Sequence, residues 1–390
     1  MKRQIAFVFG GPSVEHEISI ITGLQAYLAF NNSEFEAFPL YISKDSEMYV
    51  GEGLDKIENY KNLKSVVSNA QQVILVKEGK KSKLIGYPQK KFGKNFEREI
   101  DMAFLCVHGT NVEDGNLQGY FHTLDVPIVG CDVESAALGM DKFTQKAVLA
   151  EAGVPVLPAR RYTSKDYQNL DALIENIKKN FEFPVIVKPV NLGSSVGISV
   201  AKDETELVRS LDDAFLYASV VLVERAISHL REINCSVLGD IEEARASEIE
   251  EPVGSDEILS YQDKYMNNQK GGSKGMASVS RKIPAEVSPE KREEIRDLAV
   301  RAFKALGCNG VARIDFMIDV DTDELVFNEI NTIPGSLSFY LWEPLGVSYA
   351  ELLNMMVDLA NKRERIKNSL TFSFDTNVLD SASLAGAKGK

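Results

Sequence analysis

Four polar side chains near the end of the chain have the types and the spacing of a metal and phosphate site. Arg313 and Asp315 are two residues apart in the segment ARIDFMID, and Glu329 and Asn331 are two apart in NEINTIPG. In an extended strand, residues two apart share a face, so each pair points to one side of its strand. Carboxylate and amide oxygens suit Mg²⁺, which usually shares its ligands with phosphate groups. The pattern therefore indicates magnesium-dependent phosphate chemistry.

These two strands are expected to pair as a hairpin. Residues 319–323, DVDTD, form a short, turn-rich connection, and a register with Asp315 opposite Glu329 would bring the four polar groups together. The alternative is a hairpin with a solvated polar face, although such faces more often carry Lys, Thr or Ser. A calcium-binding loop is rejected, because Glu324 and Ile330 replace its required Gly and its closing Glu.

A second candidate site lies in residues 183–199, FPVIVKPVNLGSSVGIS. The pattern indicates a buried strand that carries Lys188, followed by a loop with Gly193, Ser194 and Ser195. Glycines let backbone N–H groups approach phosphate oxygens, the hydroxyls add donors, and the lysine adds a positive charge. The segment is not a P-loop, because the helix and the terminal Gly-Lys-Ser/Thr are missing. An ordinary Gly/Ser loop remains the alternative.

Two acids follow this loop. Glu224 ends the mostly apolar segment SVVLVE, and Glu232 lies eight residues further on. Either carboxylate could accept a hydrogen bond from an adenine amino group or a ribose hydroxyl.

The N-terminal elements are those of an open α/β sheet. Residues 4–9 are nearly all apolar and lead through Gly10-Gly11-Pro12 into a helical pattern over residues 15–28. Residues 103–107 form another buried-type strand, which ends at His108. Strand ends of such sheets present functional residues, so His108 is considered jointly with Glu15. A dinucleotide-binding loop is disfavoured, because its later glycines are missing.

The remaining elements are expected to be scaffold. Residues 141–152 indicate a helix with Lys142 and Lys146 one turn apart, which on surface helices are usually solvated. The helix that starts at Ser288-Pro289 carries an apolar stripe typical of core packing. Residues 44–100 carry no recognisable site, and the polar tail after Lys362 is expected to be partly disordered.

Composition limits the classes of partner. The 390 residues carry a formal charge of -13 with a pI near 5.0, which argues against a general nucleic-acid partner. No segment approaches the roughly 18 apolar residues of a membrane span, and no signal peptide is evident. The four cysteines have no paired spacing and are expected to be reduced and buried. A cytoplasmic protein that does not bind membranes is expected.

Taken in order, these segments resemble the D-alanine:D-alanine ligases of the ATP-grasp superfamily over nearly the whole chain. The matching stretches are GGPSVEHEIS, HGTNVEDGNLQG, GMDKFTQK, VIVKPVNLGSSVGIS, VLVERAI with REI, YQDKY, ARIDFMID and NEINTIPG. The resemblance implies an α/β fold of the ATP-grasp type, in which an N-terminal open α/β domain precedes two ATP-grasp domains that sandwich the nucleotide. The expected division is residues 1–138, 139–238 and 239–364, with a polar tail over 365–390.

The resemblance implies ATP and two Mg²⁺ ions as cofactors, with Mn²⁺ as a possible substitute. Asp315, Glu329 and Asn331 would bind the metal. The residues implied in nucleotide binding are Lys142 and Lys188 for the phosphates, Gly193 and Ser195 in the covering loop, Glu224 and the backbone near Ile227 for adenine, and Glu232 for the ribose.

The resemblance also implies the reaction. The carboxylate of one D-alanine takes the γ-phosphate of ATP, and the amine of a second D-alanine attacks the acyl phosphate to give D-alanyl-D-alanine for peptidoglycan. Arg313 and the backbone N–H of Gly335 would stabilise the oxyanion. Around the first D-alanine, the resemblance implies that Glu15 binds the ammonium and is tied to Ser194 and Tyr265, with His108 nearby. Lys264 would lie on a mobile loop that includes Tyr261 and residues 270–275. Tyr340 and Leu341 would lie at the second substrate.

The sequence departs from the family pattern in three places. Val112 replaces a glycine that usually precedes Glu-Asp-Gly, the segment SLSFYLWEP after Gly335 is one residue longer than usual, and the ribose acid is displaced by one position. The family usually has a Ser-containing segment in place of SLSFYLWEP, which holds the carboxylate of the second substrate.

Alternative functions follow from these departures. One is a ligase for another amino acid pair, in which Phe339, Tyr340 and Trp342 reshape the acceptor pocket or are simply packed. An ester-forming ligase is disfavoured, because the mobile loop has the YQDKY form with Tyr265 rather than His. A non-catalytic nucleotide-binding module would be expected to lack a metal ligand or Arg313, and neither is lost. The family also suggests a homodimer.

Overall fold

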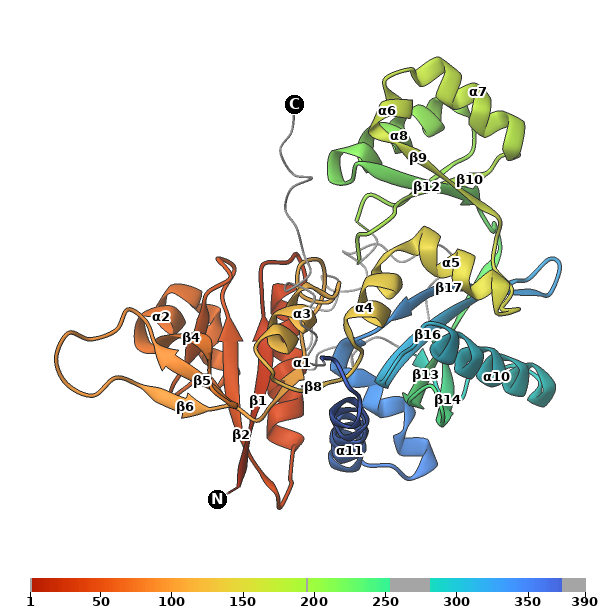
Figure 1. Cartoon of the computed structure of the whole chain (residues 1–390). Helices are drawn as coiled ribbons and strands as arrows, with labels where there is room; N and C mark the ends of the chain where they lie inside the picture. Colours follow the sequence, from red (N-terminus) through yellow and green to blue (C-terminus); the bar gives the residue numbers. More distant parts are fainter. Residues whose placement is uncertain (1, 194–195, 253–280, 374–390) are drawn as a thin grey trace, which may run out of the picture.

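The strands in the described part of the chain form three sheets that follow one another in sequence, with helices packed on their faces (Figure 1). The computed structural model describes residues 2–193, 196–252 and 281–373. This arrangement confirms the predicted α/β class. No helix in these described ranges combines the length and the apolar character needed to cross a membrane.

The first sheet has eight strands in the order β6-β5-β4-β3-β2-β1-β7-β8. Its parallel half, β2-β1-β7-β8, is built from nearly continuous apolar runs, because both faces are buried. Residues 44–100 extend the sheet with antiparallel strands, as expected of a peripheral scaffold. The strands are β1 (Arg3–Gly10), β2 (Phe35–Ile42), β3 (Met48–Val50), β4 (Gln71–Glu78), β5 (Lys81–Gly86), β6 (Glu97–Glu99), β7 (Met102–Leu105) and β8 (Ile128–Val129), and the helices are α1 (His16–Ala29), η1 (Ile57–Lys61), α2 (Leu63–Asn69) and α3 (Asn116–Thr123).

The second sheet has four antiparallel strands in the order β11-β10-β12-β9. Its helices are amphipathic: α7 buries Leu173, Ile174 and Ile177 against the sheet and is capped by the side chain of Asn169. In Figure 1 this unit stands apart above the rest of the molecule. Its elements are β9 (Ala159–Thr163), α6 (Ser164–Tyr167), α7 (Leu170–Asn180), β10 (Val185–Pro189), β11 (Ser199–Ala201), α8 (Glu204–Tyr217) and β12 (Val220–Arg225).

The third sheet has five antiparallel strands in the order β15-β14-β13-β16-β17. The predicted helix after Ser288 is α10, which is capped by that serine and packs its apolar stripe on the sheet. The expected division at residue 238 placed most of β13 with the central unit, whereas β13 pairs with β14 and β16. The elements are α4 (Val133–Met140), α5 (Lys142–Glu151), β13 (Leu230–Gly239), β14 (Ala244–Pro252), β15 (Arg281–Lys282), α10 (Pro289–Ala305), β16 (Gly310–Asp319), β17 (Glu324–Asn331), η3 (Gly335–Leu341) and η4 (Glu343–Leu345).

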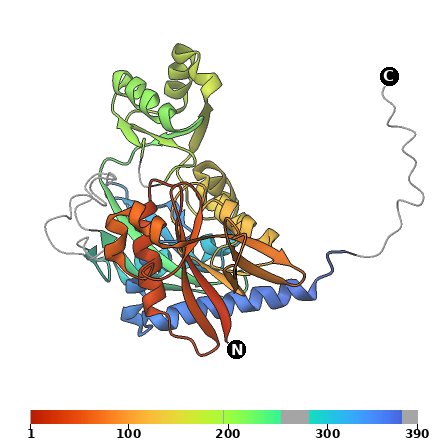
Figure 2. The ribbon, with the colours of Figure 1, turned by 90° about the vertical axis from the view of Figure 1, so that its left-hand side faces the viewer.

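The last helix, α11 (Tyr349–Ser369), packs between the first and third sheets: it contacts β8 and α1, and it also contacts β13 and β16. Its residues Leu352, Leu353 and Met356 belong to the same hydrophobic cluster as the strands β1, β2 and β7. Arg363 donates hydrogen bonds to two backbone carbonyls next to β8, those of Ile128 and Gly130. Figure 2 shows α11 in blue lying across the base of the molecule, close to the N-terminal strands.

The four cysteines are free and buried, as expected from their spacing.

Candidate active site

The strands β16 and β17 pair in the predicted register, with Asp315 opposite Glu329 and Arg313 opposite Asn331. Arg313 donates two hydrogen bonds of 2.7 Å from Nε and Nη2 to the two carboxylate oxygens of Asp315. The amide nitrogen of Asn331 donates to Asp315 Oδ2 at 2.9 Å. Arg313 is 9% exposed and Asp315 is 2% exposed. The alternative of a solvated polar face is therefore wrong.

The ion pair with Asp315 keeps the guanidinium of Arg313 protonated. Burial alone would lower the pKa of the guanidinium, but the adjacent Asp315 raises it well above its ordinary value. A buried cation is thus fixed between the carboxylate of Asp315 and the open cavity described below.

The lysines of helix α5 are buried, so the alternative of two solvated lysines is wrong. Lys142 Nζ donates to the backbone carbonyl of Leu192 at 2.8 Å and lies 3.7 Å from Glu329 Oε2. Lys146 Nζ lies 2.8 Å from Glu224 Oε2, where both side chains are at most 5% exposed. Helix α5 therefore carries one lysine to the β16–β17 hairpin and one to the second sheet.

Glu224 on β12 lies between two lysines. Lys188 Nζ on β10 donates to Glu224 Oε1 at 2.6 Å and to the side-chain oxygen of Asn328 at 3.2 Å. Burial would raise the pKa of Glu224, but Lys188 and Lys146 outweigh burial and hold the pKa below its ordinary value. Burial lowers the pKa of Lys146 despite its partner. The cluster holds two lysines around a single acid.

A second cavity opens beside this cluster. Lys188, Glu224 and Ile227 contribute to its lining. Four apolar side chains from separate segments also line it, namely Leu157, Ile186, Leu230 and Met317. Apolar walls combined with a few polar groups are typical of small-molecule and cofactor sites.

Glu15 reaches the site from the first sheet, at the residue before α1. A Cβ on Gly109 would lie 2.8 Å from Glu15 Oε2, and one on Gly193 would lie 3.0 Å from the same atom. Gly193 thus allows the glycine-rich loop to approach this carboxylate closely. Nearby, the Nε2 atom of His108 lies 2.8 Å from the hydroxyl of Thr22. Burial lowers the pKa of His108 to about 4, so its ring is neutral near pH 7.

Glu113, which was not predicted, connects the first sheet to the third. Its Oε1 accepts from the backbone N–H of Ile333 at 2.9 Å and from the hydroxyl of Thr332 at 3.3 Å, and its Oε2 accepts from the N–H of Gly109 at 3.1 Å. Burial, together with the charge of Glu15, raises its pKa to about 8. Its partner residues lie 219 and 220 positions away in sequence, so no local pattern could have indicated these contacts.

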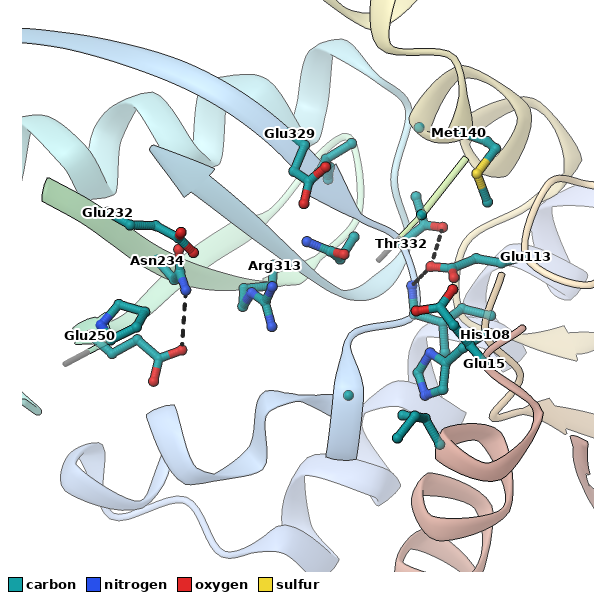
Figure 3. Close-up of a pocket in the computed structure, with 18 of the residues that line it drawn as sticks. Glu15, His108, Glu113, Met140, Glu232, Asn234, Glu250, Arg313, Glu329 and Thr332 are labelled. Carbon is teal, nitrogen blue, oxygen red and sulfur yellow. Dashed lines mark hydrogen bonds between the residues drawn. The ribbon is translucent and has the colours of Figure 1, made fainter. Parts of the chain in front are cut away.

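The main cavity is lined by side chains of the first and third sheets and their connecting segments (Figure 3), together with Gly193 from the loop after β10. It also includes residues that were not predicted: Glu113, Asn234, Glu250 and Arg281. Val112, a departure from the family pattern, packs beside Gly11. The predicted residues that line the cavity are Glu15, His108, Lys142, Gly193, Glu232, Arg313, Glu329, Asn331, Gly335 and Tyr340.

Other predicted residues lie elsewhere. Asp315 is buried behind Arg313, and the side chain of Leu341 is fully buried outside the cavity lining. Trp342 is also fully buried and donates from Nε1 to Ser236, which supports simple packing for this aromatic residue. The remaining predicted residues, Ser194, Ser195, Tyr261, Lys264, Tyr265 and residues 270–275, lie outside the described residues.

The side chains at the β16–β17 hairpin offer oxygen atoms, which are the ligands that a hard cation prefers. Asp315 and Glu329 lie opposite each other in the register of β16 and β17 and offer carboxylate oxygens, and the side-chain amide of Asn331 offers a third oxygen. No cluster of three or more His, Cys, Asp or Glu side chains arranged for a metal occurs in the part of the chain that the structure describes. A metal held here by protein would therefore have two carboxylates and an amide, and would complete its shell with water or phosphate.

Comparisons with known proteins agree with this geometry. Residues 4–131 match the family described as the D-ala D-ala ligase N-terminus, and residues 148–358 match the D-ala D-ala ligase C-terminus. The D-alanine–D-alanine ligase of Acetivibrio thermocellus is 37% identical over 389 residues, which cover 93% of this chain and 96% of that protein. That of Caldicellulosiruptor bescii is 38% identical, with 95% and 99% covered.

Solved structures support the fold. The VanG D-Ala:D-Ser ligase from Enterococcus faecalis is similar with a TM-score of 0.76 at 30% identity, covering 92% of this chain and 100% of that chain. The D-alanine-D-alanine ligase from Coxiella burnetii gives a TM-score of 0.77 at 26% identity, covering 94% and 96%. These neighbours confirm the predicted ATP-grasp fold, and with the family matches they show that the chain belongs to the D-alanine–D-alanine ligase family.

Proposed function

We propose that the protein is an ATP-dependent ligase that joins two D-alanine molecules into D-alanyl-D-alanine, a peptidoglycan precursor, through an acyl phosphate. The observation that carries this proposal is the main cavity. It combines an anchor for an ammonium group at Glu15, cations for phosphate at Lys142, oxygen donors for a metal at Glu329 and Asn331, and a buried guanidinium at Arg313.

The nucleotide would bind between the second and third sheets. The apolar second cavity suits the adenine ring, with Glu224 and the backbone near Ile227 at its polar edge. Lys188 and Lys142 would hold the phosphates, and Glu232 would accept from the ribose. Gly193 together with Ser194 and Ser195 would cover the phosphates.

The metal would be held by Asp315, Glu329 and Asn331, whose oxygens suit Mg²⁺, or Mn²⁺ in its place. We propose two ions, as the resemblance implies. When bound, the metal would neutralise phosphate charge and so favour attack by a carboxylate. Asp315 now accepts from Arg313 and Asn331, so binding would require these contacts to be shared or exchanged.

The protein residues would act mainly by positioning. Glu15, tied to Ser194 and Tyr265 as the resemblance implies, would bind the ammonium of the first D-alanine and direct its carboxylate towards the γ-phosphate. A carboxylate oxygen then bonds to phosphorus and ADP leaves. His108 is neutral near pH 7 and bonded to Thr22, so it would contribute a hydrogen bond rather than a charge.

The second half-reaction would occur beside Arg313. The amine of the second D-alanine attacks the acyl carbonyl carbon, phosphate leaves with the bonding electron pair, and the amine loses a proton. Arg313 and the backbone N–H of Gly335 would stabilise the oxyanion, and Lys264 would reach the transferred phosphate. Exclusion of water matters here, because an exposed acyl phosphate would hydrolyse. A homodimer in the cytoplasm remains the expected form of the protein.

Phosphate release by the purified protein, measured with each amino acid singly and in pairs, tests the proposal. Release should require ATP, a divalent metal and D-alanine, and the product should be D-alanyl-D-alanine. Release with other amino acids only would favour a ligase for a different pair. No release with any amino acid would favour a non-catalytic nucleotide-binding module.

A further inference from the structure

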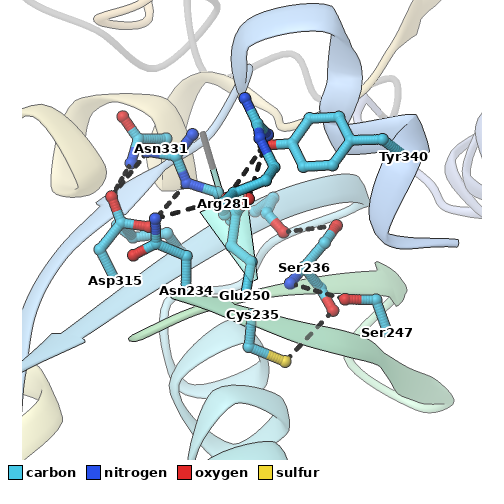
Figure 4. Close-up of polar contacts among 12 residues, drawn as sticks. Asn234, Cys235, Ser236, Ser247, Glu250, Arg281, Asp315, Asn331 and Tyr340 are labelled. Atoms are coloured by element: carbon cyan, nitrogen blue, oxygen red, sulfur yellow. Dashed lines mark hydrogen bonds and ion pairs between the residues drawn. The ribbon is translucent and has the colours of Figure 1, made fainter. Parts of the chain in front are cut away.

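Three residues that the proposed reaction does not yet use as a group lie together on one wall of the main cavity. They are Glu250 on β14, Arg281 on β15 and Tyr340 in η3. Figure 4 shows the side chain of Arg281 next to the Tyr340 ring and close to Glu250. They come from three separate segments, so their meeting is a property of the fold.

The three side chains bind one another through ionic, hydrogen-bond and ring contacts. Arg281 Nη1 lies 3.0 Å from Glu250 Oε2, and its guanidinium carbon is 4.1 Å from the centre of the Tyr340 ring. The Tyr340 hydroxyl donates to Glu250 Oε1 at 3.0 Å. A guanidinium stacked on an aromatic ring and paired with a carboxylate has little rotational freedom. The guanidinium is therefore held in a defined position at the cavity wall.

Burial of these charged side chains costs free energy, which points to a functional reason for the arrangement. Glu250 is 3% exposed, and Arg281 is 13% exposed at its side chain. Burial also keeps the Tyr340 phenol neutral by raising its pKa, so that it remains a hydrogen-bond donor to Glu250. Buried ion pairs contribute little net stability compared with apolar packing, so packing alone does not account for this one.

The acceptor amino acid brings a carboxylate that needs a cation in this cavity. The Lys and Arg side chains among the described lining residues are Lys142, Arg281 and Arg313. Lys142 contacts Leu192 and Glu329 at the nucleotide side. Arg313 gives two hydrogen bonds to Asp315 and faces the reacting carbonyl in the proposed mechanism. Arg281 is the cation placed beyond Arg313, on the acceptor side.

We propose that Arg281 binds the carboxylate of the acceptor amino acid, and that Glu250 and Tyr340 are positioning residues that aim its guanidinium. This inference rests on the proposed function. A guanidinium offers donors along more than one edge, so it can bind Glu250 with one edge and a substrate carboxylate with another. The segment after Gly335 supports the assignment, because Tyr340 lies in it and its ring contacts Arg281.

The backbone that presents Tyr340 is unusual. Ser336, Leu337 and Ser338 all have φ near +50°, a left-handed conformation that costs free energy for residues other than glycine. Two contacts with α1 hold its first residue: the N–H of Ser336 donates to Thr22, and its hydroxyl donates to Gln25. Strain that neighbouring contacts stabilise in this way is typical of functional segments.

The decisive experiment compares D-alanine with D-alaninamide as acceptor in the Arg281→Ala variant. The rate depends on D-alanine through one Michaelis constant for the donor site and one for the acceptor site. The variant should raise the acceptor constant roughly 10- to 100-fold, as expected for the loss of a charge-assisted contact. The donor constant and the KM for ATP should stay within about 2-fold. D-alaninamide lacks the carboxylate, so the variant should lose little or none of its rate with this acceptor.

Matched variants separate binding from structure. Lys282→Ala changes the neighbouring residue of β15, whose side chain bonds to the exposed Glu286, and should leave all constants unchanged. Glu250→Gln should raise the acceptor constant by a smaller factor with kcat little changed, because the guanidinium is kept but less well aimed. If Arg281→Ala does not fold, Arg281→Lys decides: it should raise the acceptor constant several-fold and spare the donor constant.

The outcomes distinguish this inference from the proposed function. If the wild-type protein forms no dipeptide from D-alanine, the proposed function fails first. If the wild type is active and the folded Arg281 variants keep the acceptor constant, or lose rate with D-alanine and D-alaninamide by the same factor, then Arg281 is structural and the inference is wrong.

Discussion

Two buried charge clusters on either side of Lys142 use similar residues but differ in net charge. The cluster in the second sheet has Lys188 and Lys146 around Glu224, which gives a formal excess of one positive charge. The cluster on the β16–β17 hairpin has Arg313 with Asp315 and Glu329, which gives an excess of one negative charge. Lys142, 3.7 Å from Glu329, lies at the border between them.

The difference indicates what each cluster can bind. A positive excess in a partly dry site attracts phosphate oxygens, whereas a negative excess attracts a metal cation. A metal–triphosphate complex has both kinds of charge and would satisfy both clusters at once. The pair therefore suits a nucleotide with its metal better than it suits either ligand alone.

Removal of a negative charge from the hairpin cluster should have the largest effect. Asp315→Asn should lower kcat roughly 100- to 1000-fold, because one metal ligand and the partner of Arg313 are weakened together. ADP release measured against Mg²⁺ concentration checks this: the variant should need more Mg²⁺ than the wild type, and high Mg²⁺ should restore its activity only in part.

The matched control is Glu324→Gln on the same hairpin, where the carboxylate is half exposed and pairs with Arg225. It should keep full activity. If Asp315→Asn turned over as fast as the wild type, the negative charge of the hairpin cluster would not be needed for metal binding, and the functional difference between the clusters would be contradicted.

Removal of a positive charge from the other cluster should weaken nucleotide binding. Lys188→Met should lower ATP affinity roughly 10- to 100-fold and should destabilise the fold by roughly 3 to 5 kcal/mol, because Glu224 loses a buried partner. Equilibrium nucleotide binding and urea unfolding measure the two effects. Lys165→Met on α6 is the control, since that side chain is exposed.

A triple variant sharpens this test. Adding Lys146→Met and Glu224→Gln to Lys188→Met removes all three charges of the cluster, so no buried charge is left unpaired, and stability should largely return while ATP affinity stays low. Recovery of both properties would mean that Lys188 serves only to neutralise Glu224.

Glu113 lies outside both clusters, and its replacement should have the smallest effect. Glu113→Ala leaves the N–H groups of Gly109 and Ile333 without this acceptor, and should cost roughly 1 to 3 kcal/mol in the free energy of unfolding. In the wild type, folding raises the pKa of Glu113 from an ordinary 4.5 to about 8. Between these two pH values the folded state therefore holds a proton that the unfolded state releases. Stability should therefore fall as the pH rises from about 4.5 to about 8, and the variant should lack this decline. Thermal unfolding at several pH values measures it, and an equal pH slope in both proteins would contradict the assignment.

The hairpin was predictable from sequence because period-two spacing and a short polar turn determine both the strands and their register. The helices at 142–151 and 289–305 were predictable for similar local reasons. Local patterns could not show that Lys146 is buried, because an i, i+4 lysine pair looks the same on a solvated helix. The opposing Glu224 becomes visible only when α5 meets the second sheet.

The acceptor wall was predictable only in part. Tyr340 was expected to reshape this pocket, and the departure in length after Gly335 was the signal. Glu250 and Arg281 gave no signal, because an acid-rich run such as residues 248–251, EIEE, is typical of a solvated edge. Their role depends on the pairing of β14 with β15 and on the approach of η3, which are tertiary contacts between distant segments.

The packing of α11 into the core of the first sheet has a consequence for synthesis on the ribosome. The strands β1, β2 and β7 emerge early, but Leu352, Leu353 and Met356, which complete their hydrophobic cluster, are translated more than two hundred residues later. Until α11 is made, part of the apolar surface of the N-terminal sheet therefore stays exposed, and in this state the nascent chain can bind chaperones or aggregate. A messenger truncated before α11 would yield a chain whose earliest domain is the one left unfinished.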